Sequence, residues 1–192
     1  GSVHCNAPVT AVDVVDGAAT GLVLGDGTRI RAGQVVANVN PRLLPDLLPP
    51  GTLTSSQDEV RTFRPGLATM MIHCALSDLP AWRAADAQRF NYVHVGGTID
   101  DMALAYTQAA AGRLPDRPVL VVGQPTVSDP SRAPEGQHVL WVQVRVLPSV
   151  LASGQAWSEV AEAYADQVMA ILEEHAPGLS EQVLARHVMS PA

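Results

Sequence analysis

Short apolar runs separated by glycine-rich turns open the chain. Between Pro8 and Pro41 the valines and leucines gather in stretches, and the breaks fall at Asp16-Gly17 and at Gly25-Asp26-Gly27. Glycine tolerates positive φ and Asp hydrogen-bonds to its own backbone, so both breaks suit tight turns. The pattern predicts an antiparallel hairpin or meander.

The texture changes after Pro41. Prolines and glycine break residues 41–57, which favours a short helix from Arg42 to Leu48 followed by a loop. We therefore place a domain crossing near Asn40, which gives one segment of residues 1–40 and a second of residues 41–192.

Alternating or continuous apolar stretches in the second segment predict strands. They cover residues 66–76, 91–95, 118–123 and 138–147, with a final strand over 184–188. The strand at 138–147 is the clearest, because one side is uniformly apolar and predicts a core face. Its other side carries Trp141, Gln143 and Arg145 and faces a cavity or solvent.

Two helices interrupt these strands. The first runs over 99–111, where Thr98 and Asp101 resemble a capping arrangement and Gly112 suits the end. The second runs over 156–175, with apolar residues at steps of three and four. The order predicts an α+β fold, a mixed or antiparallel sheet with helices packed on one face. The other face is then able to roof a ligand cavity.

Composition narrows the classes of function. The 192 residues carry a net charge of −7 and contain no lysine, which argues against a nucleic-acid partner. No apolar run approaches the length of a transmembrane segment, and we expect no such segment. Cys5 and Cys74 are interpreted as buried free thiols of a reducing, cytoplasmic protein, although sequence leaves a disulfide between them open. The scattered histidines show no metal-binding spacing.

No self-sufficient catalytic centre is visible, and the catalytic residues stay unknown. The chain lacks the Gly-x-Gly-x-x-Gly of dinucleotide folds and the Gly-x-Ser-x-Gly of hydrolases. His73 and His94 lie in apolar strands and are interpreted as hydrogen-bonded core residues, with a catalytic role as the less favoured alternative. Trp141 and Met70-Met71 are assigned to packing, with the lining of an apolar tunnel as the alternative. Arg132 is assigned to solvent or to capping.

Two long motifs carry more information than any single residue. The first consists of four ordered pieces, Pro8-Val9-x-x-Val12, Gly21-Leu22-Val23-Leu24, Asp26-Gly27-x-x-Ile30-x-Ala32 and Val35-Val36-x-Asn38-x-x-Pro41. The second is P-T-x-S-D-P-S-x-A-P-E-G-x-H, from Pro125 to His138. Together they resemble FAD-dependent oxidoreductases of the phytoene desaturase and phytoene dehydrogenase type, in the amine oxidase-like superfamily.

That resemblance implies different roles for the two segments of the chain. Residues 1–40 correspond to a β-meander of an incomplete FAD-binding domain, in which the backbone of Val9 contacts the adenine of FAD. Residues 41–192 correspond to the substrate-binding domain. The substrate implied is apolar, carotenoid- or polyene-like, and it is desaturated or isomerised by hydride transfer to the flavin.

The family's dinucleotide fingerprint would precede the first residue here, and its second flavin-binding stretch would follow Pro191. We therefore expect a middle piece, inactive alone, with FAD bound in the full-length parent and none bound here. A flavoenzyme that oxidises amines, and a non-catalytic ligand-binding or interaction domain, stay open as alternatives. Unpaired strand edges of the meander predict a homodimer.

Overall fold

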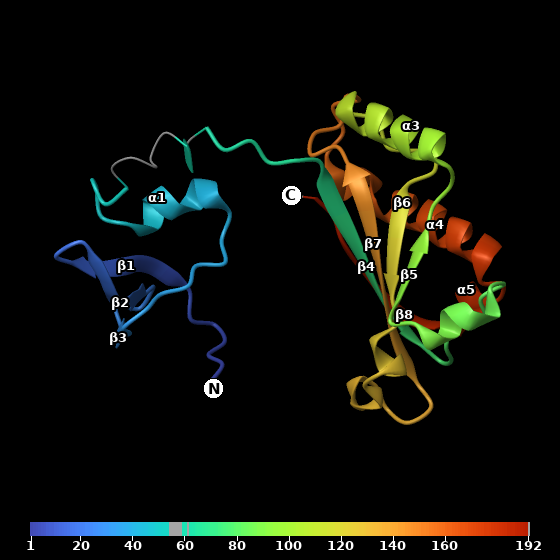
Figure 1. Ribbon diagram of the computed structural model, residues 1–192, viewed down its shortest axis with the longest axis horizontal. Coiled ribbons are helices and arrows are strands. Elements are labelled where there is room, and N and C mark those ends of the chain that lie inside the picture. The colour runs from blue at the N-terminus through green and yellow to red at the C-terminus, as the bar shows by residue number, and fades with distance from the viewer. Residues whose placement is uncertain (54–58, 61, 192) are drawn as a thin grey trace. The chain divides into compact units, whose positions relative to one another are not determined.

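The computed structural model describes residues 1–53, 59–60 and 62–191 and forms two compact units, Gly1–Pro65 and Gly66–Ala192 (Figure 1). Residues 54–57 of the predicted loop lie outside the described residues. The predicted division into segments 1–40 and 41–192 stays a prediction. In the structure, residues 41–65 belong to the first compact unit, where the short helix α1 contacts the first strand.

The first unit contains a three-stranded antiparallel meander. Its strands lie in the order β1-β2-β3 and span Val9–Val15, Ala18–Leu24 and Arg29–Arg31. Asp16 and Gly17 adopt φ of 50° and 78° in the first turn, the conformation that two-residue hairpins require. Gly21 lies so close to the Ile30 carbonyl oxygen that a Cβ there would overlap it. The predicted meander is therefore present, with a third short strand.

The predicted helix after Pro41 is divided into two short pieces. A 3-10 helix, Pro41–Leu43, leads into α1, Leu44–Leu47. Asn40 caps the first piece, because its side chain accepts a hydrogen bond from the Arg42 amide. Pro45 lies in the first turn of α1, where its missing N–H costs nothing.

The second unit is built on a five-stranded antiparallel sheet in the order β5-β6-β7-β4-β8. The strands span Ala68–Leu76 (β4), Tyr92–Val95 (β5), Val119–Gly123 (β6), His138–Leu147 (β7) and Val183–Met189 (β8). The helices are Ile99–Ala110 (α3), Trp157–His175 (α4) and Leu179–Gln182 (α5). This architecture confirms the predicted α+β class.

The core lies between one face of the sheet and α4 (Figure 1). The sheet contributes alternate residues of β4, β6 and β7, and the helix contributes its apolar stripe. Fully buried members include Met70, Ile72, Leu76, Leu120, Val122, Leu140, Val142, Val144, Ala165, Val168 and Leu172. The uniformly apolar side of β7 thus faces the core, as its alternation predicts.

Helix α3 begins at the predicted capping box. Thr98 Oγ1 accepts a hydrogen bond from the Asp101 amide, and the Asp101 carboxylate accepts one from the Thr98 amide. Thr98 Oγ1 also donates a hydrogen bond to the Asp101 carboxylate at 2.8 Å, and the bonds from the Thr98 amide and hydroxyl lower the pKa of Asp101. Gly112 follows the helix with φ of 74°, which confirms its predicted place at the end.

Strand β7 contains an irregular step near its end. Val144 pairs with Met70 but Leu147 pairs with Ala68, so β7 has one residue more than β4 over this stretch. Within it Val146 adopts φ of 66°, a left-handed conformation that is uncommon for a β-branched residue. The step is a β-bulge that returns Leu147 to the core, where it is fully buried.

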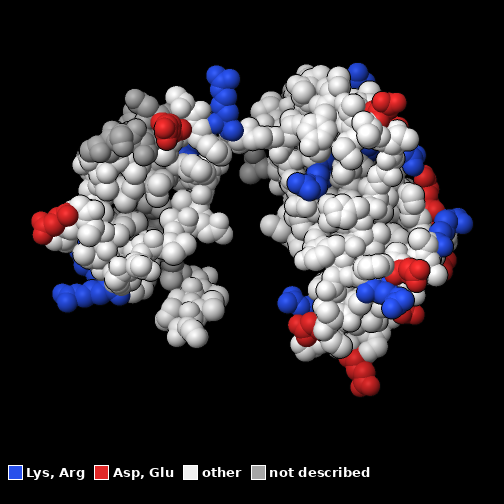
Figure 2. All heavy atoms as spheres, in the orientation of Figure 1, with Lys and Arg blue, Asp and Glu red and all other residues white. Residues whose placement is uncertain are grey.

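Charged side chains are interspersed over the surface in view (Figure 2). Arg186 of β8 donates hydrogen bonds to Glu162 and Asp166 of α4, at 2.7 and 2.6 Å. These ion pairs join the last strand to the helix layer. None of the helices in the described part of the chain has both the length and the apolar character that a membrane crossing requires.

Candidate functional site

The face of the five-stranded sheet that looks away from the core carries the most distinctive chemistry of the chain. We call it the open face. Its first transverse row follows directly from the strand register and crosses all five strands: Tyr92, Gly123, Trp141, His73 and His187. The row combines aromatic and imidazole rings with one glycine.

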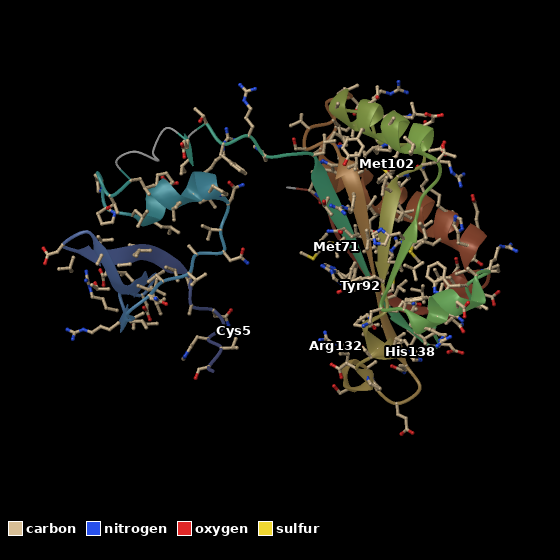
Figure 3. All side chains as sticks on the ribbon, in the orientation of Figure 1. Cys5, Met71, Tyr92, Met102, Arg132 and His138 are labelled. Carbon is tan, nitrogen blue, oxygen red and sulfur yellow. The ribbon has the colours of Figure 1, made fainter. Side chains whose placement is uncertain are left out.

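A second row lies beside the first. It consists of His94, Val121, Gln143, Met71 and Met189. Neither row contains an acidic residue or an arginine, and most members are half-buried or exposed. Met71 and Tyr92 lie on the side of the sheet opposite α4 (Figure 3). The open face is therefore a broad, weakly polar surface backed by a rigid sheet.

Gly123 determines how the aromatic residues of this face lie. A Cβ on Gly123 would overlap Cε2, Cζ2 and Nε1 of the Trp141 indole, so only glycine lets the ring lie over the strand. Tyr92 meets this indole edge to face, with ring centroids 5.4 Å apart and an angle of 60° between the planes. Such pairs add about 0.5–1.5 kcal/mol beyond burial.

A pocket of about 220 Å³ lies at the end of the open face next to this aromatic pair. Tyr92 and Trp141 form one wall, and the loop between β6 and β7 supplies Asp129 and Arg132. Figure 3 shows Tyr92 and Arg132 at the same end of the sheet. The loop is the Pro125–His138 motif of the sequence, so this motif shapes a pocket as well as a turn.

The loop holds its shape through Asp129. Its Oδ1 accepts hydrogen bonds from Ser131 Oγ at 2.6 Å and from the Ser131 amide at 3.3 Å, and its Oδ2 accepts one from Arg132 Nε at 3.0 Å. The Ser131 side chain, followed by Arg132, lowers the pKa of Asp129. Arg132 thus has the capping contact that the sequence suggested, and Gly136 adopts a φ of 74° in the following turn.

Buried polar contacts hold the two segments that carry Asn91 and Pro125 of the pocket lining. Gln124 is fully buried, and its Oε1 accepts a hydrogen bond from Trp82 Nε1 at 2.8 Å. Its side-chain Nε2 donates hydrogen bonds to the carbonyl oxygens of Ala87 and Phe90. Its backbone N–H donates one to the backbone carbonyl oxygen of Asn91. The segment preceding β5 is therefore anchored to the segment following β6.

The structure contradicts the interpretation of His73 and His94 as core residues. His73 and His94 alternate with core residues and so lie on the open face, half-buried and exposed respectively, and not in the core. Both strands look apolar because apolar residues occupy both of their faces. Met70 packs in the core as expected, whereas Met71 and Trp141 lie on the open face.

The cysteines differ from one another. Cys74 is buried in β4, and burial raises the pKa of its thiol to about 11. Cys5 is exposed, which contradicts the prediction that both are buried, because it precedes the meander and packs in no core. Both thiols are free. Among the described residues, no three His, Cys, Asp or Glu side chains converge in a way that could hold a metal ion.

Val9, the predicted adenine contact, lies at the start of β1 and is 39% exposed. β1 is an edge strand of the meander, with β2 as its strand partner in the described part of the chain. One backbone edge of Val9 is therefore left for another group. Its role towards adenine stays a prediction.

Sequence reasoning did not single out Tyr92, Asn91 or Gly123. A usable signal was present in the sequence of β6, because a glycine in an otherwise apolar strand marks a close approach by a neighbour. Locating that neighbour as Trp141 requires the register between β6 and β7, which one strand alone does not reveal.

No protein-family model matches the chain. The chain is 29% identical over 191 residues to pyridine nucleotide-disulfide oxidoreductase domain-containing protein 2 of Mus musculus, covering 92% of this chain and 32% of that protein. It is 28% identical over 201 residues to the neurosporene-forming phytoene desaturase of Cereibacter sphaeroides, covering 100% and 36%. A shorter match, 33% over 82 residues, covers 42% of the chain and 16% of a phytoene dehydrogenase of Streptomyces griseus.

Among solved structures, an oxidoreductase from Methanosarcina mazei shares the fold. The TM-score is 0.50 at 17% identity, and the match covers 94% of this chain and 36% of that one. The chain thus spans about a third of the length of the relatives from Mus musculus and Cereibacter sphaeroides.

Proposed function

Because the chain is homologous to phytoene desaturases and to a pyridine nucleotide-disulfide oxidoreductase domain protein, we propose that it serves an FAD-dependent oxidoreductase. Residues 41–192 supply the substrate domain and residues 1–40 a meander of the flavin domain. The oxidoreductase desaturates or isomerises an apolar, polyene-like substrate. The observation that carries this proposal is the open face, a rigid and weakly polar surface with helices packed behind it.

The residues present fit two parts of such an assembly. The backbone of Val9, at the edge of β1, has a side on which an adenine could accept or donate hydrogen bonds. Trp141 and Met71 offer apolar, polarisable contacts for a conjugated chain. When bound, FAD supplies the hydride-accepting chemistry.

The chain itself would bind and orient the substrate and shield it from water. An extended apolar substrate lying along the open face contacts rings and thioethers whose positions are set by strand register, not by mobile loops. Shielding the reacting carbon from water needs no ionisable group. Hence a surface without acidic residues or arginine in its two central rows suits the reaction.

Amine oxidation is the less favoured alternative. An aromatic pair that flanks an amine beside the flavin needs a space between its rings. Tyr92 and Trp141 contact each other edge to face at 5.4 Å, so no such space exists between them. A non-catalytic binding domain would use the same open face and is distinguished by activity alone.

Binding of a conjugated probe to the 192-residue chain tests the proposed surface. Methyl parinarate, an uncharged fluorescent tetraene, should accept energy from Trp141, and Trp141→Phe should reduce that transfer. Met71→Lys should weaken binding at least about tenfold, because a charge then lies in an apolar site. Met102→Lys, on the exposed part of α3, is the matched control and should leave binding unchanged. Equal effects of the two lysines would overturn the assignment of the open face.

Activity requires the full-length protein. With flavin bound and oxygen removed, a polyene substrate should bleach the flavin absorbance, whereas primary amines should not. A reading frame without an upstream Gly-x-Gly-x-x-Gly, or bleaching by amines alone, would contradict the proposed reaction.

A further inference from the structure

The pocket beside Tyr92 is too small to hold a whole substrate. Its volume of about 220 Å³ lies below the range of roughly 300–1,000 Å³ that is typical for complete small-molecule sites. It opens next to Trp141, which belongs to the first row of the open face. The geometry therefore suits one end of a longer molecule whose body continues along the open face.

Hydrogen-bond donors line this pocket. Arg132 uses its Nε to bind Asp129, while its two terminal nitrogens have no partner among the described residues. A guanidinium fixed at one edge and open at the other presents its remaining N–H groups in a defined direction. An oxygen atom that accepts hydrogen bonds is the complementary group.

The charges of the pocket favour a neutral oxygen atom over a carboxylate oxygen. The Asp129 carboxylate lies 3.0 Å from Arg132 Nε and balances its positive charge. Its pKa is lowered by the Ser131 and Arg132 contacts, so it is ionised at neutral pH. A second carboxylate would meet a pocket whose cation is already paired, whereas a neutral carbonyl or hydroxyl oxygen meets no such repulsion.

Asn91 is a further polar residue of the pocket lining. Its Oδ1 is buried without a hydrogen-bond partner in the described part of the chain. An atom with almost no accessible surface lies beyond the reach of a ligand in the pocket, so this acceptor places no demand on the end group.

The pocket is also preformed. Gln124 binds the backbone of Phe90 and Asn91 on one side of it, and Thr126 Oγ1 lies 3.0 Å from His138 Nδ1 where the loop joins β7. The aromatic wall is held by the contact between Tyr92 and Trp141. Binding an end group here requires little ordering of the protein, which favours affinity.

We propose that this pocket recognises an uncharged oxygen-bearing end group, a carbonyl or hydroxyl, of a conjugated apolar substrate whose body lies along the open face. Arg132 is the specificity-determining residue. The inference rests on the proposed function for the body of the substrate, and it adds that the substrate has one oxygenated end.

Four retinoids with one carbon skeleton separate these points: retinal, retinol, retinoate and the hydrocarbon axerophthene. Because the chain has no lysine, retinal cannot form a Schiff base with a side-chain amine. Quenching of tryptophan fluorescence in the 192-residue chain measures each dissociation constant. We expect retinal and retinol to bind about tenfold more tightly than axerophthene and retinoate.

Two variants test the residues. Arg132→Met should remove the advantage of retinal over axerophthene and leave axerophthene unchanged. Arg89→Met is the matched control, because Arg89 also pairs with an Asp three residues earlier but lies outside the pocket. Asp129→Asn keeps the Ser131 contact and leaves Arg132 unbalanced, so it should strengthen retinoate binding.

The outcomes distinguish the two proposals. If no retinoid binds, the proposed function of the open face fails with this one. If axerophthene binds but retinal has no advantage, or if Arg132→Met preserves that advantage, only the end-group pocket is overturned. Unchanged retinoate binding by Asp129→Asn would overturn the selection against anions. A urea midpoint equal to that of the wild type shows that a variant is folded normally.

Discussion

Trp141 lies over Gly123 so closely that its indole occupies the space of a Cβ on that glycine. The two residues are register partners in β7 and β6. The contact places the indole within reach of Tyr92, one strand further on. A single missing side chain thus determines the aromatic end of the open face.

Gly123→Ala should displace the indole and break its contact with Tyr92. Overpacking of this kind costs about 1–3 kcal/mol of unfolding free energy, measured by urea denaturation. The near-ultraviolet circular dichroism of the aromatic pair should weaken at the same time. Gly66→Ala is the control, since its Cβ would meet no atom within 4 Å and no positive φ is required there. Equal stability of both variants would contradict the contact.

Gln124→Leu should destabilise the second unit by about 2–4 kcal/mol. It leaves the Trp82 N–H and two carbonyl oxygens in a buried site without their hydrogen-bond partner. Adding Trp82→Phe to this variant should cost less than Trp82→Phe does alone, since the indole N–H has already lost its partner. Chemical denaturation of the four proteins in the double-mutant cycle gives the coupling. Purely additive effects would show that the hydrogen bond contributes nothing.

Glu173 should make stability depend on pH. Its carboxylate accepts hydrogen bonds from the Gly178 and Ser180 amides and from Ser180 Oγ, and the Ser180 and Gly178 backbone bonds lower its pKa. A carboxyl group whose folded pKa lies below its unfolded value, about 4.3, stabilises the fold above that value. The stabilisation is lost as pH falls through the folded pKa.

The urea midpoint should therefore fall less steeply between pH 5 and pH 3 (about one unit on either side of the unfolded pKa) in Glu173→Gln than in the wild type. Glu135→Gln, at an exposed glutamate whose side chain has no partner in the described part of the chain, controls for removal of a surface charge. Identical pH profiles for wild type and Glu173→Gln would show that the Glu173 hydrogen bonds do not cause the pH dependence of stability.

The purified 192-residue chain should show no visible flavin absorbance after expression. It lacks a Gly-x-Gly-x-x-Gly turn, whose backbone would approach the pyrophosphate. Added FAD should be removed by gel filtration. A stoichiometric yellow complex would mean that this chain alone provides a full flavin site.

The meander should form a concentration-dependent homodimer. β1 and β3 are the edges of its sheet, and Val15 is 57% exposed at the end of β1. Unprotected edges pair with other chains, and a lysine there opposes the pairing. Val15→Lys should shift the sedimentation coefficient towards that of a monomer, whereas Val150→Lys, in a loop of the second unit, should not. A wild type that sediments as a monomer at all concentrations would contradict this prediction.

Local patterns predicted most of the fold. The alternation along β7 identified its core face, and Thr98 with Asp101 marked the start of α3, because both signals act within a few residues. His73 was misassigned, since an apolar run does not reveal which face a helix covers. The pocket was not predicted, because it joins β5, the β6–β7 loop and β7 through pairings that sequence spacing does not encode.

The bulge at the end of β7 prevents that strand from sliding. A strand that pairs regularly along its whole length can slip by two residues and keep every side chain on its own face. In β7 the extra residue between Val144 and Leu147 interrupts the two-residue repeat, so such a slip would have to move the bulge as well and take Leu147 out of its buried position. One residue at the far end of the strand thus keeps Trp141 opposite Gly123. The aromatic wall and the pocket beside it take their alignment from a position that touches neither.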